Sequence, residues 1–203
     1  MSDLPETTVR HFTELFSTPA FPPDPRDTDE AKKATAWNAK FEPRPDRDYE
    51  VEFDYAMKLY EESSEGFDRV DDKGEFLFKF TAFALGGIPT ASKAMDLKIT
   101  FWTVASFVFF GLAFVFLLIS IYRARKSTPV DVSNILDFST KPDRLPDATN
   151  DQVTHLTRGF LAASAHVAIS EINAIVGWKS QQQARACVCI ILGLAFAMIW
   201  ACR

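Results

Sequence analysis

Residues 99–122 read ITFWTVASFVFFGLAFVFLLISIY, a run of 24 residues without a charged side chain. As an α-helix this run would be roughly 36 Å long, more than the ~30 Å hydrocarbon core of a bilayer. Trp102 and Tyr122 lie near its two ends, where aromatic side chains favour the membrane–water interfaces. Soluble core helices rarely extend this far without a charge, so the pattern predicts a transmembrane helix over 98–122.

Two further segments are apolar enough to enter a membrane. Residues 186–202 read ACVCIILGLAFAMIWAC, which predicts a last membrane helix over 184–203. Residues 76–91 read FLFKFTAFALGGIPTA and are a weaker candidate, because they contain Lys79, two glycines and a proline. We expect 76–91 to form a marginal first membrane helix whose lysine extends to the headgroups; an interfacial or re-entrant helix is the alternative.

Basic residues directly follow the longest apolar run: Arg123, Arg125 and Lys126. Cytoplasmic loops carry the excess of Lys and Arg, so this end of the helix is expected in the cytoplasm. With three crossings the N-terminus is cytoplasmic too, together with the polar stretches 1–75 and 123–183. The sequence therefore predicts a membrane protein that works from the cytoplasm.

Charge is distributed unevenly along the chain. Residues 1–75 carry 20 acidic and 10 basic side chains, whereas the remainder carries 7 acidic and 12 basic ones. A pI of about 5.2 and the lack of a sustained Lys/Arg run exclude a basic nucleic-acid binder. The three cysteines all lie in the last apolar segment, so the chain does not read as a disulfide-stapled secreted domain.

The polar N-terminal part divides into two segments. Residues 1–48 hold seven of the eleven prolines, which predicts a proline-rich mobile arm. In 49–75 apolar residues recur at heptad-like steps, which predicts an amphipathic cytoplasmic helix leading into the first membrane segment. The stripe consists of Phe53, Ala56, Tyr60, Ser63, Phe67 and Val70.

The later polar part reads as a loop over 123–149 and a second cytoplasmic helix over 150–183, which Gly177 would break in an alternative interpretation. The two cytoplasmic helices each have an apolar face that needs a partner, so we expect them to pack as an antiparallel stalk. The sequence thus predicts an all-α membrane protein with two or three transmembrane helices and a two-helix cytoplasmic stalk.

Residues for catalysis or metal binding do not cluster in this sequence. His155 and His166 are eleven residues apart, roughly 16 Å along a helix, which is too far for one metal ion. Cys187 and Cys189 are two residues apart and point to nearly opposite sides of a helix, unlike the ligands of a zinc site. No phosphate-binding glycine motif occurs. We therefore expect no enzyme activity, no cofactor and no metal.

A small-residue spacing marks the last apolar segment. Gly193, Ala197 and Ala201 are four residues apart, which lets another helix approach closely. The neighbouring helix is either the chain's own span or another copy of the chain.

A short acidic–basic step lies at the end of the first cytoplasmic helix: Asp71, Asp72, Lys73 and Gly74, followed by Glu75, Phe76, Leu77 and Phe78. With this step the chain resembles the Pycsar transmembrane effectors and, more loosely, the SLATT effectors of bacterial anti-phage systems. The later part is similar as well, since a helix with Asn173 and Lys179 precedes the last apolar segment. The likeness covers 49–203, and Gly74 stands where alanine is commoner.

The resemblance implies a membrane effector of a bacterial anti-phage system, in the inner membrane with its N-terminus cytoplasmic. A cyclic nucleotide would bind the cytoplasmic part, and the membrane part would then oligomerise and impair the bilayer. The implied partners are the lipid bilayer, further copies of the chain and a cyclic nucleotide, and not nucleic acid; the motif itself assigns no residue to nucleotide contact. A non-catalytic structural or scaffolding subunit of a larger membrane complex is the alternative.

Overall fold

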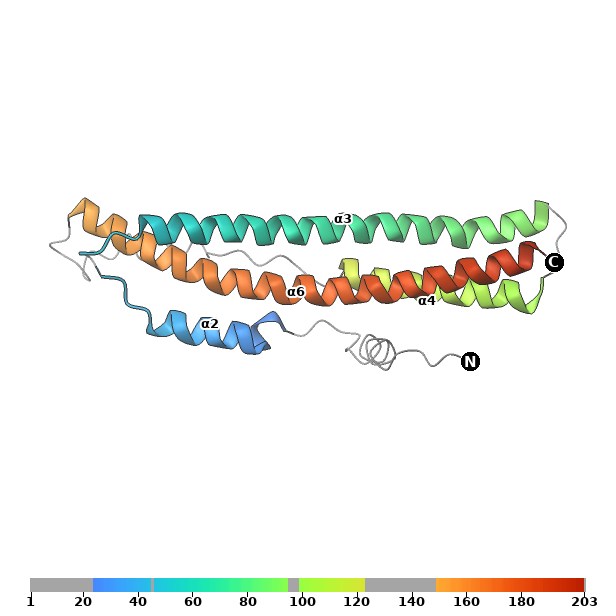
Figure 1. The fold of residues 1–203 in the computed structure, drawn as a ribbon, viewed down its shortest axis with the longest axis horizontal. Coiled ribbons are helices and arrows are strands. Elements are labelled where there is room, and N and C mark those ends of the chain that lie inside the picture. Colours follow the sequence, from blue (N-terminus) through green and yellow to red (C-terminus); the bar gives the residue numbers. More distant parts are fainter. Residues whose placement is uncertain (1–23, 45, 95–98, 123–148, 203) are drawn as a thin grey trace, which may run out of the picture. The chain divides into compact units, whose positions relative to one another are not determined.

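The computed structural model describes residues 24–44, 46–94, 99–122 and 149–202. Throughout these ranges the regular elements are helices, which confirms the predicted all-α class (Figure 1). They are the 3-10 turn η1 (Pro25–Asp27) and the helices α2 (Asp29–Lys40), α3 (Glu50–Ala94), α4 (Phe101–Tyr122) and α6 (Asn150–Ala201).

Helix α2 lies inside the segment that the prolines suggested would be a mobile arm. Thr28 caps it, because the Thr28 hydroxyl accepts a hydrogen bond from the backbone N–H of Ala31 at 3.2 Å. Ala31 and Ala34 are buried, so the helix also packs against the rest of the chain. The expectation for 1–48 is therefore wrong for α2: proline density averaged over that stretch hides a proline-free, alanine-rich run with good helix propensity.

Helix α3 joins two predicted segments, the amphipathic stretch 49–75 and the weaker apolar stretch 76–91, into one helix of 45 residues. Pro89 lies inside this helix, although a proline removes one helical hydrogen bond. The glycines and the proline therefore do not end the apolar stretch, which continues as helix.

Helix α6 is 52 residues long and begins at the predicted position. Its start has a reciprocal cap: the Thr149 hydroxyl accepts from the Gln152 N–H at 3.4 Å, and the Gln152 side chain accepts from the Thr149 N–H at 3.0 Å. Gly177 lies within the helix, so the alternative in which this glycine breaks it is wrong.

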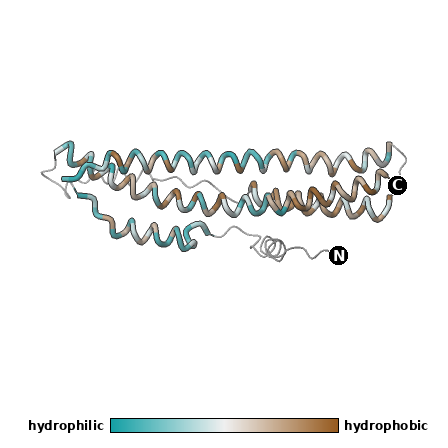
Figure 2. Tube along the Cα trace, viewed as in Figure 1, coloured by the Kyte–Doolittle hydropathy of each residue, from teal (hydrophilic) through white to brown (hydrophobic). Residues whose placement is uncertain are grey.

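The described residues group into two compact units, and α3 and α6 contribute to both. The polar unit comprises 24–68 and 149–176. The apolar unit comprises 69–94, 99–122 and 177–202. Figure 2 shows hydrophobic residues concentrated along α4 and the C-terminal parts of α3 and α6.

The polar unit buries the stripe predicted for α3. Phe67 is 4% exposed, and the stripe residues Phe53, Ala56, Tyr60 and Ser63 are half-buried. Helix α6 buries small and branched apolar side chains in this unit, namely Leu156, Ala163, Ala165, Ala168, Ile172 and Ile175. Both helices thus direct apolar side chains into the core of this unit.

The core of the apolar unit is a cluster from α4 and α6: Phe110, Ala113, Leu117, Ala186, Cys189 and Ile190. Side chains of α3 pack against it, among them Leu77, Leu85 and Ile88. Phe78 of α3 also stacks on Phe114 of α4, with ring centroids 4.7 Å apart. The stretch 76–91 therefore belongs to the same helical bundle as the two longer apolar segments.

Helices α3 and α6 run in the same direction within the apolar unit. Asp71 contacts Lys179, and Gly74 lies against Gln183, so the pairs advance together along both helices. The antiparallel arrangement expected for the stalk is wrong here. The physical reason is simple: two helices that both lead from the polar part of the chain into apolar segments share one direction.

Two described helices are long and apolar enough to cross a membrane, α4 over Phe101–Ile121 and α6. Both expose large apolar side chains: Phe101, Val104, Phe107, Val108, Leu112, Val115 and Leu118 on α4, and Ile191, Leu192, Leu194, Met198 and Ile199 on α6. Apolar surface of this extent is more stable in lipid than in water. Among the described helices, α3 with its stretch 76–91 is not apolar enough to be counted with these two, so a membrane crossing by 76–91 stays a prediction.

Candidate functional site

The motif at residues 71–74 lies on α3, and two of its four residues face α6. Asp71 and Gly74 contact α6, whereas Asp72 and Lys73 are exposed. The structure therefore divides the motif into a contact pair and a solvent-facing pair.

Lys179 of α6 is the partner of Asp71. The Lys179 ammonium donates a hydrogen bond to the Asp71 carboxylate, and the lysine side chain is 0% exposed while that of Asp71 is 42% exposed. A buried ammonium is costly unless a carboxylate and further polar atoms compensate for its lost hydration. The pair therefore ties α3 to α6 at one defined register.

Gln183, one turn after Lys179, makes a second polar contact with α3. Its side-chain amide donates to the backbone carbonyl of Val70 at 2.6 Å. A Cβ atom on Gly74 would lie 2.7 Å from the same amide nitrogen, closer than real contacts allow. Glycine at 74 thus leaves space for the Gln183 side chain.

Further polar side chains are buried close by in the sequence of α6. Gln182 is 0% exposed and Arg185 is 2% exposed, and the Arg185 guanidinium donates to the side-chain amide oxygen (Oε1) of Gln182 at 3.3 Å. The same guanidinium lies 5.9 Å from the centre of the Phe116 ring of α4. Sequence analysis missed these residues, although a glutamine run and an arginine next to an apolar segment are a visible signal.

Gly193 packs against α4 of the same chain. A Cβ atom there would lie 3.0 Å from the Phe110 ring, and the Ser106 hydroxyl donates to the Gly193 carbonyl at 2.8 Å. Ala197 is half-buried and Ala201 is exposed. The first position of the small-residue spacing is thus covered by the chain's own span.

Other predicted residues carry no clustered chemistry. Arg123, Arg125 and Lys126 lie outside the described residues. Nowhere in the described ranges do three His, Cys, Asp or Glu side chains form a group that could hold a metal ion. The three cysteines are free thiols, with Cys189 buried and Cys202 exposed.

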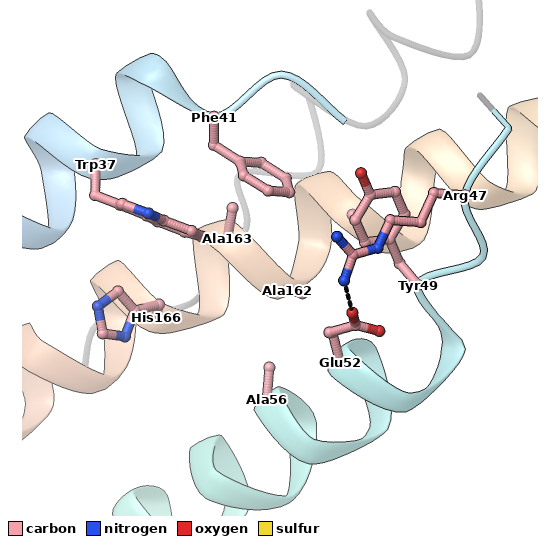
Figure 3. A pocket seen from close by; sticks show the side chains of 10 residues that line it. Trp37, Phe41, Arg47, Tyr49, Glu52, Ala56, Ala162, Ala163 and His166 are labelled. Atoms are coloured by element: carbon pink, nitrogen blue, oxygen red, sulfur yellow. Dashed lines mark hydrogen bonds and ion pairs between the residues drawn. The ribbon is translucent and has the colours of Figure 1, made fainter. Parts of the chain in front are cut away.

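The polar unit contains a pocket of about 480 Å³ between α2, α3 and α6 (Figure 3). Aromatic side chains form one wall: Trp37, Phe41 and Tyr49. The floor is made of small residues: Ala56, Gly159, Ala162 and Ala163. Arg47, Glu52 and His166 complete the lining. The pocket therefore combines flat apolar surface with groups that donate and accept hydrogen bonds.

The aromatic wall is held by ring contacts. Trp37 and Phe41 stack with centroids 4.9 Å apart, and Trp37 meets the His166 ring edge-on at 5.8 Å. Phe41 meets the buried Tyr49 ring edge-on at 5.9 Å. Trp37 nevertheless stays 50% exposed, so part of its indole surface is available to a ligand.

The loop before α3 is fixed on α6 by charge and by close packing. Arg158 of α6 donates to Asp48 at 3.3 Å and to Glu50 at 3.1 Å. Gly159 allows the close approach of this loop, because a Cβ atom there would lie 2.9 Å from Pro43 and 3.2 Å from the Tyr49 ring. The pocket wall is thus built against α6 through one arginine and one glycine.

Arg47 and Glu52 form the charged end of the pocket. They make a hydrogen-bonded ion pair, and the Arg47 guanidinium also lies 5.1 Å from the centre of the Tyr49 ring. A hydrogen bond from the helix backbone, and then the Arg47 guanidinium, lower the pKa of Glu52 below its usual value. Glu52 is therefore an ionised acceptor at neutral pH.

Taken with their exposed apolar surfaces, α4 and α6 define a helical membrane protein with an attached polar unit. The chain belongs to the Pycsar effector family, because the family model of the Pycsar effector protein domain matches residues 55–202. Comparison with curated proteins and with solved structures found no match. The family match confirms the predicted resemblance and supports a role as a bacterial anti-phage effector.

Proposed function

We propose that the chain is a non-catalytic effector of the bacterial inner membrane, which binds a cytoplasmic cyclic nucleotide, oligomerises and impairs the membrane. The observation that carries this proposal is that α3 and α6 each contribute to both units. A ligand that changes the packing of these helices in the polar unit acts on the same two helices that, together with α4, form the apolar unit. Ligand binding and membrane state are thereby linked through differential affinity for two helix arrangements.

In the proposed topology three helices cross the bilayer. Arg123, Arg125 and Lys126 keep the C-terminal end of α4 in the cytoplasm, and α6 enters from the cytoplasm. The chain must then cross once before α4, and 76–91 supplies that crossing. Its packing on the α4–α6 cluster supports this assignment.

Lys79 is compatible with a crossing by 76–91. Its ammonium lies 2.6 Å from the carboxylate of Glu75, one turn earlier on α3. The lysine also lies near the start of the stretch, where its side chain reaches the headgroups. Its position and its ion pair both reduce the cost of a charge that would be about 3 kcal/mol at the bilayer centre.

Oligomerisation would use the C-terminal end of α6. Ala197 and Ala201 leave surface there for close approach of a second copy, whereas Gly193 is covered by Phe110. Replacing both alanines by leucine should reduce cross-linked oligomers in membranes while leaving the fold intact. Unchanged cross-linking in this variant would contradict the proposed contact.

The function is tested by expressing the chain in bacteria together with a nucleotide cyclase and following membrane potential with a potential-sensitive dye. We expect depolarisation only when both proteins are active, with a catalytically inactive cyclase as the control. Retained potential at saturating cyclic nucleotide would contradict the proposal. A scaffolding subunit would instead leave the potential intact and co-purify in a stoichiometric complex that is lost when residues 1–48 are deleted.

A further inference from the structure

The pocket of the polar unit has the size and lining of a small-molecule site. Its volume of about 480 Å³ lies within the range of ligand pockets. The half-exposed Trp37 lines it, together with Phe41, and large aromatic side chains with free surface at a concave site are typical of ligand recognition. We propose that this pocket binds a cyclic mononucleotide, with the base on Trp37 and the phosphate at Arg47. This inference rests on the proposed function and adds the place and the contacts of the ligand.

The aromatic wall suits the base. Trp37 comes from α2, and its free indole surface borders a floor of small side chains at Ala162 and Ala163 (Figure 3). A planar base that lies on this floor stacks on the indole without displacing a bulky side chain. Stacking of a base on an aromatic ring is tolerant of sequence, because every base has a π-face.

The charged end favours a ligand with one negative charge. Arg47 is the basic and Glu52 the acidic side chain in the pocket lining, and their formal charges cancel. A single phosphate lets the Arg47 guanidinium exchange the Glu52 carboxylate for a phosphate oxygen, and guanidinium matches such oxygens in a bidentate geometry. A triphosphate would bring several negative charges next to Glu52 with one guanidinium to compensate, so it fits less well.

Glu52 has a role in the occupied pocket. Once Arg47 turns to the phosphate, the Glu52 carboxylate, which is 44% exposed, can accept hydrogen bonds from the ligand as well as from water. A cyclic mononucleotide supplies donors in its ribose hydroxyl and, depending on the base, in its N–H groups. A free phosphate ion supplies neither these donors nor a ring for Trp37.

The same ligand would contact both long helices. Ala56 and Glu52 come from α3, whereas Ala162, Ala163 and His166 come from α6. A bound nucleotide therefore adds contacts that depend on the relative packing of α3 and α6 in this unit. That dependence is the differential affinity on which the proposed response relies.

Binding is tested with the purified full chain in detergent, by titration calorimetry with the 3′,5′-cyclic monophosphates of adenosine, guanosine, cytidine and uridine. The corresponding nucleosides and inorganic phosphate are titrated in parallel. We expect at least one cyclic mononucleotide to bind and its nucleoside and phosphate to bind far more weakly. Failure of all four to bind, or equal binding of the nucleoside, would overturn the assignment of the ligand class.

Variants locate the site. Trp37→Ala removes the stacking surface and Arg47→Ala removes the phosphate partner, and each should weaken binding about tenfold or more. Ala162→Leu fills the floor without removing a polar group and should also abolish binding. Tyr55→Ala and Lys33→Ala change an exposed aromatic and an exposed basic residue of the same unit outside the pocket, and should bind as the unmodified chain does.

The outcomes separate the site from the function. If the Trp37 and Arg47 variants stay folded by circular dichroism and bind as tightly as the unmodified chain, the inferred site is wrong while the proposed function stands. If the unmodified chain binds a cyclic mononucleotide and these variants do not, yet the ligand never depolarises membranes, the site stands and the function is wrong. Wild-type affinity in Ala162→Leu also overturns the site.

Discussion

Lys179 and Asp71 are 108 residues apart in the sequence, and the fully buried lysine donates a hydrogen bond to the half-exposed carboxylate. The contact joins α6 to α3 within the apolar unit, next to the Gln183 contact with the Val70 carbonyl. Two polar contacts one turn apart specify the register of two helices that are otherwise held by apolar packing, which is less directional.

Replacing Asp71 by asparagine should destabilise the chain by about 2–3 kcal/mol, because it leaves the buried Lys179 ammonium without its carboxylate. Thermal unfolding in detergent measures the loss. Asp72→Asn is the matched control, since Asp72 is exposed on the next position of the same helix and should change stability little. In the double variant Asp71→Asn with Lys179→Met most of the loss should be recovered; an additive double variant would show that the pair does not couple.

Gly74→Ala should not stabilise the chain, although alanine is the better helix former, because the loss of a hydrogen bond of about 1 kcal/mol offsets the gain in helix propensity. The new Cβ atom displaces the Gln183 amide, which then loses its bond to the Val70 carbonyl. Gly66→Ala and Gly177→Ala are matched controls, because nothing lies within 4 Å of a Cβ atom at either position. These controls should stabilise the chain by about 0.5–1 kcal/mol, and a stabilising Gly74→Ala would refute the close-contact explanation.

Lowering the pH should reduce the stability of the polar unit, because it protonates the Glu52 carboxylate. Its pKa is lowered in the folded chain by the backbone hydrogen bond and then by Arg47. The stabilisation that ionised Glu52 gives to the folded chain is therefore complete above the ordinary carboxyl pKa. It is lost as the pH falls through the lowered pKa of Glu52 in the folded chain. Chemical unfolding of the unmodified chain and of Glu52→Gln between neutral and acid pH measures it. The stability difference should be constant near neutrality and change toward acid; a difference independent of pH would contradict the linkage.

Cys202 offers a direct test of topology. It is exposed at the end of α6, whereas Cys189 is buried. If α6 runs outward, a membrane-impermeant maleimide should label Cys202 in intact spheroplasts, and Cys202→Ser should remove the label. Labelling that requires lysis would place this end of the chain in the cytoplasm and reverse the proposed orientation.

The apolar helices were predictable because their signal is local. The uncharged run at 99–122 exceeds what a soluble helix needs, and α4 occupies it at Phe101–Tyr122. Helix α2 was missed because neighbouring prolines dominate the composition of its segment. The capping threonine at position 28 is the signal that would have found it.

Pairings across the sequence could not be predicted. The motif drew attention to Asp71 and Gly74, but their partners Lys179 and Gln183 depend on the register of α3 against α6, which composition does not specify. The pocket could not be predicted for the same reason, because Trp37, Arg47 and His166 come together only after α2 and the loop before α3 pack on α6. Local sequence patterns thus predict the helices, whereas the contact pairs and the pocket depend on packing between residues that are far apart in the sequence.

The family match starts at residue 55, while the side chains that line the aromatic and charged sides of the pocket on α2, on the loop and at the start of α3 all precede it. In the inferred site, residues 24–54 therefore supply the base and phosphate contacts from outside the matched domain, and exchanging them should change the ligand while the apolar unit stays the same. A chimera that keeps residues 55–202 and replaces residues 24–54 with the corresponding segment of another protein would be the starting point for such a change of ligand.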